Sequence, residues 1–483
     1  GRSEEALAAY DAVVKRFGES AEPTLRERVA RALVNKGNRL GELGRSEEAL
    51  AAYDAVVKRF GESAEPTLHE QIARALFNKG NRLETLGRSE EALAVYDAVV
   101  ERFGESPEPT LRARVARALV NKGNRLGVLD RSEEALAVYD AVVERFGESS
   151  EPALHEPISR ALFNKGNRLG ELGRSEEALA VYDAVVERFG NSSDPALREG
   201  VARALVNKGN RLGELGRSEE ALAVYDAVVE RFGQSSEPAL HEQIARALVN
   251  KGHDLEGLRR IDEAEAAFRR AIALAGGQMK GSTLNSLGNM LLDRKGDPAG
   301  ALQAYEMGLL AEPTPDQRAF LHANCAYALA LHGGDLPRAD THAQQALVDG
   351  TSISAAGRNL LQALSCLNDP RGPHWQRMFE QIGMAVESDD ASLWSDYIDD
   401  LQRLLWFIVV RGEGSALRLW MERAQYPMRY APLYHAVMAA IDGEDHLHKI
   451  NPETRQPAAR IFQGIAERLA AYPPKAGKSR TLP

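Results

Sequence analysis

Residues 44–51 read GRSEEALA, and the same eight letters begin again at residues 1, 87, 173 and 216. A variant that starts with Asp begins at residue 130, and a more divergent copy, RRIDEAEAAF, begins at residue 259. The starts are evenly spaced at 43 residues. A fixed period of this length is typical of solenoid proteins, in which each repeat packs on its neighbours.

Each repeat is predicted to form two helices joined by a glycine turn. In the second copy, apolar residues at helical spacing predict a first helix over residues 66–86, which begins at a proline as first helical turns often do. A second helix is predicted from Ser89, as its N-cap, to Phe103, and Gly104 ends it.

Two positions of the first helix alternate along the chain. Arg26 becomes His69 in the next repeat, and Val29 becomes Ile72, and both alternations continue through six repeats. The unit of duplication was therefore a pair of repeats, 86 residues long.

The repeat resembles the tetratricopeptide repeat. Gly37, Gly44, Ala49 and Tyr53 match its small residue in the first helix, its turn glycine and its Ala-x3-aromatic pattern. The period departs from the usual value of roughly 34 residues, and the extra residues lengthen the first helix at its start. The resemblance implies an all-α, right-handed α-solenoid, a superhelix of helix–turn–helix repeats, closed by a helical C-terminal capping region.

A lysine occupies the position where the family usually has leucine. It falls on the apolar side of the first helix, where either a snorkelling stem or a paired, partly buried ion would explain it. The residues at this position are Lys36, Lys79, Lys122, Lys165, Lys208 and Lys251.

The sequence divides into four parts. Near-identical repeats cover residues 1–275, two degenerate repeats residues 276–350, a helical cap residues 351–471 and a flexible tail residues 472–483. Helices are expected in the cap at roughly 353–367, 374–387, 391–411, 414–424, 430–442 and 454–471. The cap should be compact, because it holds the most apolar stretch of the chain and all four tryptophans, Trp375, Trp394, Trp406 and Trp420.

The chain begins at a second helix that has no first helix before it. A solenoid end without its partner helix would expose apolar side chains, so we expect the natural protein to continue upstream. Near-identical arrays of this kind resemble the repeat regions of large bacterial signalling and defence proteins. That resemblance implies a recognition or sensor part at the C-terminal end and an effector domain upstream.

Composition excludes several classes of function. The net charge of −10 argues against a nucleic-acid binder, and no apolar run is long enough to cross a membrane. Two cysteines cannot form a disulfide framework, which fits a reducing cytoplasm.

No enzyme, cofactor or metal site is predicted. Gly477-Lys478-Ser479 lacks the strand and the first glycine of a phosphate-binding loop, and Gly412 with Gly414 is an equally weak signal. Cys325 is interpreted as a buried small residue. One polar cluster is interpreted as a loop and contains Glu444, Asp445, His446 and His448. Another is interpreted as a solvated helix face and contains Asp396, Asp399 and Asp400.

The candidate site is a set of rows on the first helices, opposite their apolar side, where family resemblance places the concave surface. An amide offers a donor pair and an acceptor, which match the peptide bonds of an extended chain, and arginines would contact acidic side chains. His253 stands where a further asparagine would be. The rows contain Asn35, Asn78, Asn121, Asn164, Asn207 and Asn250; Asn38, Asn81, Asn124, Asn167 and Asn210; and Arg31, Arg74, Arg117, Arg160, Arg203 and Arg246.

The sequence thus predicts a non-catalytic module that binds a protein or an extended, acidic peptide. Two alternatives stay open: the rows echo recent duplication, or the array is a structural scaffold that self-associates. One local irregularity is also expected. Pro157 replaces Gln71 of the second repeat, and proline beyond the first turn removes a helical hydrogen bond, so this helix should begin near Pro157 or bend there.

Overall fold

The computed structural model describes residues 2–350, 353–369, 373–388 and 397–471, and no β-strand occurs in these ranges. The chain forms two compact units, Gly1–Gln243 and Ile244–Pro483, which are considered separately below. The predicted all-α solenoid is confirmed, whereas the four-part division of the sequence stays a prediction. The predicted flexible tail and the Gly477-Lys478-Ser479 segment lie outside the described residues.

The repeats consist of long first helices and shorter second helices, as the sequence predicts. The first helices are α2 (Pro23–Glu42), α4 (Pro66–Thr85), α6 (Pro109–Val128), α8 (Pro152–Glu171), α10 (Pro195–Glu214) and α12 (Pro238–Gly257). The second helices are α1 (Arg2–Phe17), α3 (Ser46–Phe60), α5 (Ser89–Phe103), α7 (Ser132–Phe146), α9 (Ser175–Phe189), α11 (Ser218–Phe232) and α13 (Ile261–Leu274).

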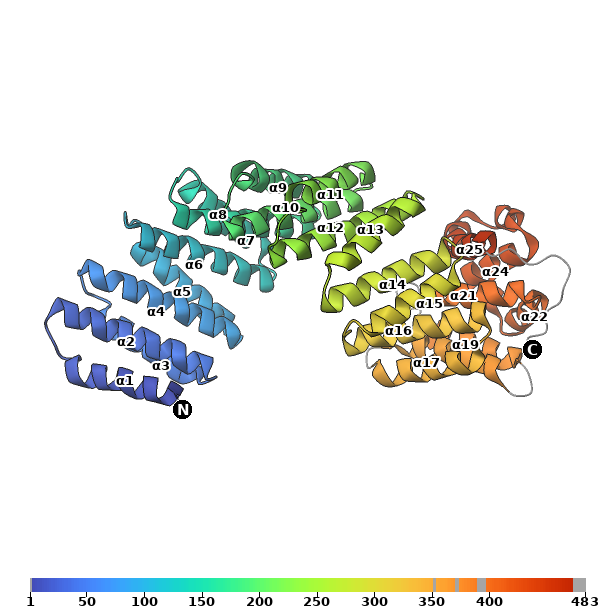
Figure 1. The fold of residues 1–483 in the computed structure, drawn as a ribbon, viewed down its shortest axis with the longest axis horizontal. Coiled ribbons are helices and arrows are strands. Elements are labelled where there is room, and N and C mark those ends of the chain that lie inside the picture. Colours follow the sequence, from blue (N-terminus) through green and yellow to red (C-terminus); the bar gives the residue numbers. More distant parts are fainter. Residues whose placement is uncertain (1, 351–352, 370–372, 389–396, 472–483) are drawn as a thin grey trace. The chain divides into compact units, whose positions relative to one another are not determined.

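In the first unit the helices form two layers. Each first helix packs against the second helix of its own repeat and that of the repeat before it, and successive first helices also contact one another (Figure 1). The second helices contact mainly first helices. The first helices therefore lie closer together, and their layer forms the inner side of the curved stack.

A glycine facing a tyrosine sets the distance between the two helices of a repeat. A Cβ atom added to Gly37 would lie 2.5 Å from the Cε1 atom of Tyr53, whose ring is buried. The following repeats have the same contact, as at Gly80 with Tyr96. The small residue of the motif therefore gives the tyrosine ring its space.

The turn between the helices requires a left-handed backbone. Gly44 and its equivalents have φ near +74°, a conformation that glycine adopts without steric cost, and Asp130 adopts it with φ of 58°. The Asp variant of the repeat therefore keeps the same turn.

The repeated lysines are ion-paired. Lys79 Nζ lies 2.5 Å from Asp54 Oδ1 on the preceding second helix, and the lysine side chain is only 23% exposed. The same pair joins Lys36 to Asp11, and it recurs at Lys122, Lys165 and Lys208. The aspartate is about half exposed, so the pair lies near the surface and both predicted alternatives apply in part: the lysine is paired, and its stem lies along the apolar side.

Two local predictions are wrong. Ser89 is the first helical residue rather than the N-cap, because Arg88 occupies the N-cap position and its Nε donates to Glu91 at 2.6 Å. Helix α8 begins at Pro152 and continues through Pro157, so the predicted late start is wrong, and the alternative, a bend at Pro157, stays a prediction. Its first turn already begins with a proline, and the helix tolerates the second one five residues later.

The alternation of Arg and His makes the interfaces between repeats unequal. Arg26 forms an ion pair with Glu65 of the following repeat, whereas His69 contacts the carbonyl of Ser63 in its own repeat at 3.1 Å. Arg112 with Glu151 and Arg198 with Glu237 repeat the first arrangement. These arginine–glutamate pairs thus lie inside each duplicated pair of repeats, whereas other ion pairs, such as Arg125 with Glu84, join one pair to the next.

The second unit begins inside α12, includes α13, and continues through two degenerate repeats into the cap. The repeats contain α14 (Gly277–Asp293), α15 (Pro298–Leu309), α16 (Pro315–Ala328), a π-helical turn (Leu329–Gly333) and α17 (Leu336–Asp349). The cap contains α18 (Ala355–Ser365), a 3-10 turn (Cys366–Asn368), α19 (Trp375–Ser388), α21 (Ile398–Val410), α22 (Gly414–Arg423), α23 (Tyr426–Arg429), α24 (Ala431–Asp442), a 3-10 turn (Glu444–Lys449) and α25 (Pro452–Ala471).

The cap shares one apolar core with the degenerate repeats. Trp406 is 3% exposed in this core, Trp375 and Trp420 pack at its edge, and Cys325 is fully buried as predicted. Helix α25 packs against both α21 and α14. Trp394 and the predicted start of a helix at residue 391 lie outside the described residues.

Candidate functional site

The asparagines of the first helices bind one another between repeats. Tyr53 donates its hydroxyl proton to Asn38 Oδ1 at 2.8 Å, and Asn78 Nδ2 donates to the same oxygen at 2.8 Å. Burial raises the pKa of Tyr53 to about 12, so its hydroxyl stays protonated and remains a donor at neutral pH. We call this arrangement an asparagine bridge.

Four such bridges join successive repeats of the first unit. Their Tyr, Asn and next-repeat Asn residues are Tyr53, Asn38 and Asn78; Tyr96, Asn81 and Asn121; Tyr139, Asn124 and Asn164; and Tyr182, Asn167 and Asn207. Asn210 accepts from Tyr225 in the same way. The two asparagine rows that the sequence predicts as neighbours are thus brought into contact. We call the surface they form on α2, α4, α6, α8 and α10 the asparagine face.

Each bridge leaves hydrogen-bonding groups unused. In the first bridge, Asn38 Nδ2 and Asn78 Oδ1 have no partner within the described part of the chain. Both residues are partly exposed. They line a hollow of about 360 Å³ together with Tyr53, Arg82 and other side chains of the same face. A donor pair and an acceptor are therefore available to a ligand at this point.

The predicted arginine row has mixed surroundings. Arg160 Nη1 pairs with Glu156 at 3.1 Å, and Arg117 Nε pairs with the same carboxylate at 3.2 Å. Arg31 lies 3.7 Å from Glu27 on its own helix, whereas Arg203 stacks on a phenylalanine ring. In the second unit, Arg246 and Asn250 also have partners. About half of the row is already neutralised by the protein's own carboxylates.

Sequence reasoning missed a second arginine row on this face. Arg125 packs beside Glu84 at 3.5 Å, and both side chains are about one-fifth exposed. Glycines of the preceding repeat make room for these arginines, as Gly127 does for Arg168. The available signal was the recurrence of glycine and arginine, which holds in the first five repeats except the second, where Glu84 replaces the glycine. The row is Arg39, Arg82, Arg125, Arg168 and Arg211.

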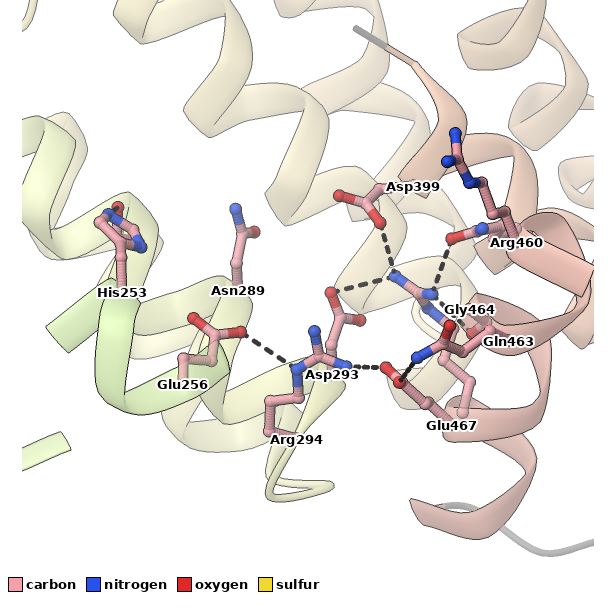
Figure 2. A pocket seen from close by; sticks show the side chains of 13 residues that line it. His253, Glu256, Asn289, Asp293, Arg294, Asp399, Arg460, Gln463, Gly464 and Glu467 are labelled. Carbon is pink, nitrogen blue, oxygen red and sulfur yellow. Dashed lines mark hydrogen bonds and ion pairs between the residues drawn. The ribbon is translucent and has the colours of Figure 1, made fainter. Parts of the chain in front are cut away.

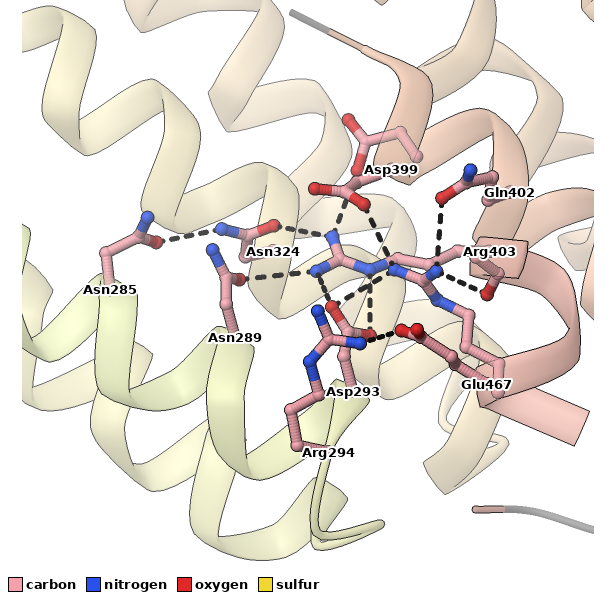
Figure 3. A network of polar contacts seen from close by, with 12 residues as sticks. Asn285, Asn289, Asp293, Arg294, Asn324, Asp399, Gln402, Arg403 and Glu467 are labelled. Atoms are coloured by element: carbon pink, nitrogen blue, oxygen red, sulfur yellow. Dashed lines mark hydrogen bonds and ion pairs between the residues drawn. The ribbon is translucent and has the colours of Figure 1, made fainter. Parts of the chain in front are cut away.

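In the second unit, the cap inserts an arginine into the corresponding face of the degenerate repeats. Arg403 of α21 is 3% exposed and donates from Nη1 to Asn324 Oδ1 at 3.1 Å and from Nη2 to Asn289 Oδ1 at 3.3 Å (Figure 3). Asn289 also accepts from Tyr305, so it holds the place of Asn38 in a bridge. A guanidinium thus joins two asparagines that elsewhere would bond directly.

Two carboxylates neutralise the buried arginine. Arg403 lies 3.0 Å from Asp293 and 3.0 Å from Asp400, and Arg468 of α25 lies 3.1 Å from Asp293 (Figure 3). The predicted solvated face is therefore wrong for Asp400, whose side chain is 19% exposed, because α21 packs that side against the repeats. Asp399 is 70% exposed but contacts Arg468, and Asp396 lies outside the described residues.

The pKa values of these two carboxylates are shifted in opposite directions. Burial raises the pKa of Asp400 to about 6, although Arg403 opposes this change. Burial would also raise the pKa of Asp293, but Arg403 and Arg468 outweigh it and hold that pKa below its ordinary value. Asp293 is therefore the permanent counter-ion of the network.

The raised pKa of Asp400 predicts a pH-dependent stability. Because its folded-state pKa lies above the unfolded-state value, its contribution to stability is present at low pH and is lost as the pH rises through about 6. Asp400→Asn should remove this dependence. The free energy of unfolding of the variant, relative to wild type, should rise by on the order of 1 kcal/mol between pH 5 and pH 7.5.

Tryptophan fluorescence during urea unfolding measures this effect, because all four tryptophans lie in the cap. Other groups titrate equally in both proteins and cancel in the difference. Parallel pH profiles of the two proteins would contradict the assignment.

A polar pocket of about 380 Å³ lies beside this network, between α12, α14, α21 and α25 (Figure 2). Arg294 crosses it, with Nε 3.1 Å from Glu256 and a terminal nitrogen on Glu467. Ser286 Oγ and His253 Nε2 are 3.4 Å apart at the site that corresponds to an asparagine bridge. The charged side chains of the pocket largely neutralise one another.

The predicted polar loop between α24 and α25 forms a 3-10 turn. His446 Nε2 lies 2.9 Å from His435 Nδ1 of α24. Over the described ranges, no group of three or more His, Cys, Asp or Glu side chains is placed to hold a metal ion. None of the helices described is both long and apolar enough to cross a membrane.

Comparison with known proteins gives a family match and weak structural likenesses. A search of curated proteins finds no match. The apo form of RapI has a TM-score of 0.49 at 13% identity, over 76% of this chain and 99% of that one. A tetratricopeptide repeat protein from Parabacteroides merdae has a TM-score of 0.37 at 16% identity, over 60% of this chain and 97% of that one. The apo form of the quorum sensor NprR from B. thuringiensis has a TM-score of 0.38 at 14% identity, over 70% of this chain and 99% of that one.

The family match agrees with the helix pairs. The sequence model of the tetratricopeptide repeat matches residues 34–107, 120–193, 163–236 and 249–317, which together are more than half of the chain. The matches cover both the near-identical repeats and the first degenerate one. The chain therefore belongs to the tetratricopeptide repeat family, as a helical-repeat module of the protein-binding kind.

Proposed function

We propose that the asparagine face binds an extended segment of a partner protein. The observation that carries this proposal is the set of unused amide groups beside each asparagine bridge. Peptide backbone in an extended conformation presents carbonyls and N–H groups at regular intervals, and the free Nδ2 and Oδ1 groups recur at each of the four bridges. A partner that lay along the face would meet the same pair of groups at each bridge.

We infer the wider role from the repeats themselves. The chain would act as the recognition or sensor part of a larger cytoplasmic bacterial protein, whose effector domain lies elsewhere in the same natural chain. Partner binding on the asparagine face would then be the signal that this protein detects. The near identity of the repeats supports this view, since a uniform face suits a ligand that is read along its length.

A test must separate binding from folding, because the asparagines also hold the repeats together. Asp in place of Asn81, Asn124 and Asn167 keeps the Oδ1 that accepts the internal hydrogen bonds and removes only the free Nδ2 donors. Each lost donor should cost about 1 kcal/mol, so the triple variant should bind roughly a hundredfold more weakly.

The probe is a peptide selected on the full chain from a displayed library of random 12-residue sequences, and affinities are measured by calorimetry. The control variant places the same three negative charges on exposed second-helix positions, Ala94, Ala137 and Ala180. Loss of affinity in both variants would indicate a charge effect. Full affinity in the asparagine variant would sink the proposal and favour the scaffold alternative, which concentration-dependent oligomers would support.

A further inference from the structure

Between the second and third repeats, an arginine lies on an aromatic ring of the asparagine face. Phe77 of α4 replaces the valine of the first repeat, and the guanidinium carbon of Arg114 lies 5.4 Å from the centre of its ring. Arg114 is partly buried. No carboxylate of the described residues lies within ion-pair distance of it. Stacking holds the flat guanidinium in place and leaves its donor edge available.

The same construction recurs two repeats later. Phe163 of α8 is 8% exposed, and the guanidinium carbon of Arg203 lies 4.4 Å from the centre of its ring. In the fifth repeat, Gly200 occupies the position that Arg114 has in the third repeat, so Arg203 contacts the ring instead. Arg203 also lacks a carboxylate partner within the described part of the chain. We call these two contacts the Phe77–Arg114 joint and the Phe163–Arg203 joint. They are separated by one duplicated pair of repeats.

The other joints differ in charge balance. Inside each pair of repeats, arginines such as Arg26 and Arg112 pair with glutamates of the following repeat. Between pairs, Arg114 instead faces two further arginines. Burial lowers the pKa of Arg114, and the charges of Arg117 and Arg74 lower it further, whereas Glu70 opposes them without reaching ion-pair distance. An anion bound there would relieve the repulsion.

We propose that the Phe77–Arg114 and Phe163–Arg203 joints are two carboxylate-binding sites that take acidic side chains of one extended peptide. This inference rests on the proposed function, since the peptide lies on the asparagine face. Neighbouring first helices are about 10 Å apart, so joints two repeats apart are separated by about 20 Å. An extended chain covers that distance in about six residues. The ligand therefore has acidic residues about six positions apart.

Capped 12-residue Gly/Ser peptides that carry two glutamates test the spacing. The full chain is titrated at low salt with three labelled probes, in which the glutamates are six apart, two apart, or six apart and replaced by Gln. Binding at both joints at once should make the first probe about tenfold or more tighter than the second, and the Gln probe should bind weakest. Equal affinities for the first and second probes would overturn the inference.

Single variants locate the sites. Arg114→Gln and Arg203→Gln should each lower the affinity for the first probe to that for the second. Arg114→Lys should bind the first probe more weakly than wild type does, because an ammonium lacks the planar fork of a guanidinium. Arg28→Gln is the matched control, since Arg28 holds the position of Arg114 in the first repeat and stacks on no ring of the described residues. Thermal unfolding of each variant checks the fold.

The outcome is separable from that of the proposed function. If library peptides bind through the asparagines while Arg114→Gln and Arg203→Gln change nothing, the face binds peptides but the joints are not carboxylate sites. If instead the glutamate probes differ in affinity as expected while the triple asparagine variant binds library peptides normally, the joints are supported as carboxylate sites. The proposed binding of peptide backbone by the asparagines is then contradicted.

Discussion

Arg403→Met is expected to lower the free energy of unfolding of the second unit by about 3–5 kcal/mol. The guanidinium is almost completely buried, and it binds Asp293 and Asp400 at 3.0 Å each. Methionine fills a similar volume but leaves Asp400 without a counter-ion and Asp293 with Arg468 alone. The cost is mainly that of the uncompensated charges rather than of lost packing.

Urea unfolding followed by tryptophan fluorescence reports this loss specifically, since the first unit contains no tryptophan. Circular dichroism of the whole chain gives the remaining helicity. Adding Asp400→Asn to the methionine variant removes the stranded charge, while Asp293 keeps Arg468, and should restore a large part of the stability. An unchanged unfolding midpoint for Arg403→Met would show that the network contributes little.

Gly123→Val is expected to destabilise the middle of the first unit by about 3 kcal/mol. A Cβ atom on Gly123 would lie 2.8 and 2.9 Å from two ring atoms of Tyr139. The ring cannot move aside, because it is buried and its hydroxyl is bonded to Asn124. The substitution therefore separates α6 from α7 and weakens an asparagine bridge at the same time.

Gly127→Val is the matched control on the same helix. The atoms nearest to its Cβ belong to the end of the flexible Arg168 side chain, which can shift at little cost. Hydrogen exchange should show faster opening of α6 and α7 in the Gly123 variant and near-normal exchange in distant repeats, because each repeat contacts only its neighbours. Equal effects of the two substitutions would contradict this account.

The local structure of the repeats could be predicted from the sequence because the signals are local. Apolar spacing, an initial proline and a turn glycine predicted α4 and α5 to within a residue or two. The glycine opposite Tyr53 belongs to the family pattern, and its close contact confirms that reading. The N-cap at Arg88 was missed, since Arg88 makes no side-chain capping hydrogen bond and its pair with Glu91 is not a signal of the usual small polar N-cap.

The partners of polar side chains could not be predicted in the same way. Periodicity placed Asn38 and Asn78 on one face, but only the packing of α2 against α4 brings the Asn78 amide to the Asn38 oxygen. The alternatives for the repeated lysine also stayed open, because its aspartate lies 25 residues earlier on another helix. Contacts between helices depend on their relative positions, which a helical wheel does not contain.

The sequence by itself determined the class of fold, the length and order of the repeat helices and which asparagines share one side of the first helices. Tertiary structure alone decided which of those residues are free for a ligand and which are occupied by the protein. Asp400 shows the difference most clearly: its sequence neighbours suggest a solvated face, yet it pairs with buried Arg403. The physical reason is that burial and charge pairing depend on what packs against a residue, and Asp293 and Asn324 come from helices far away in the sequence.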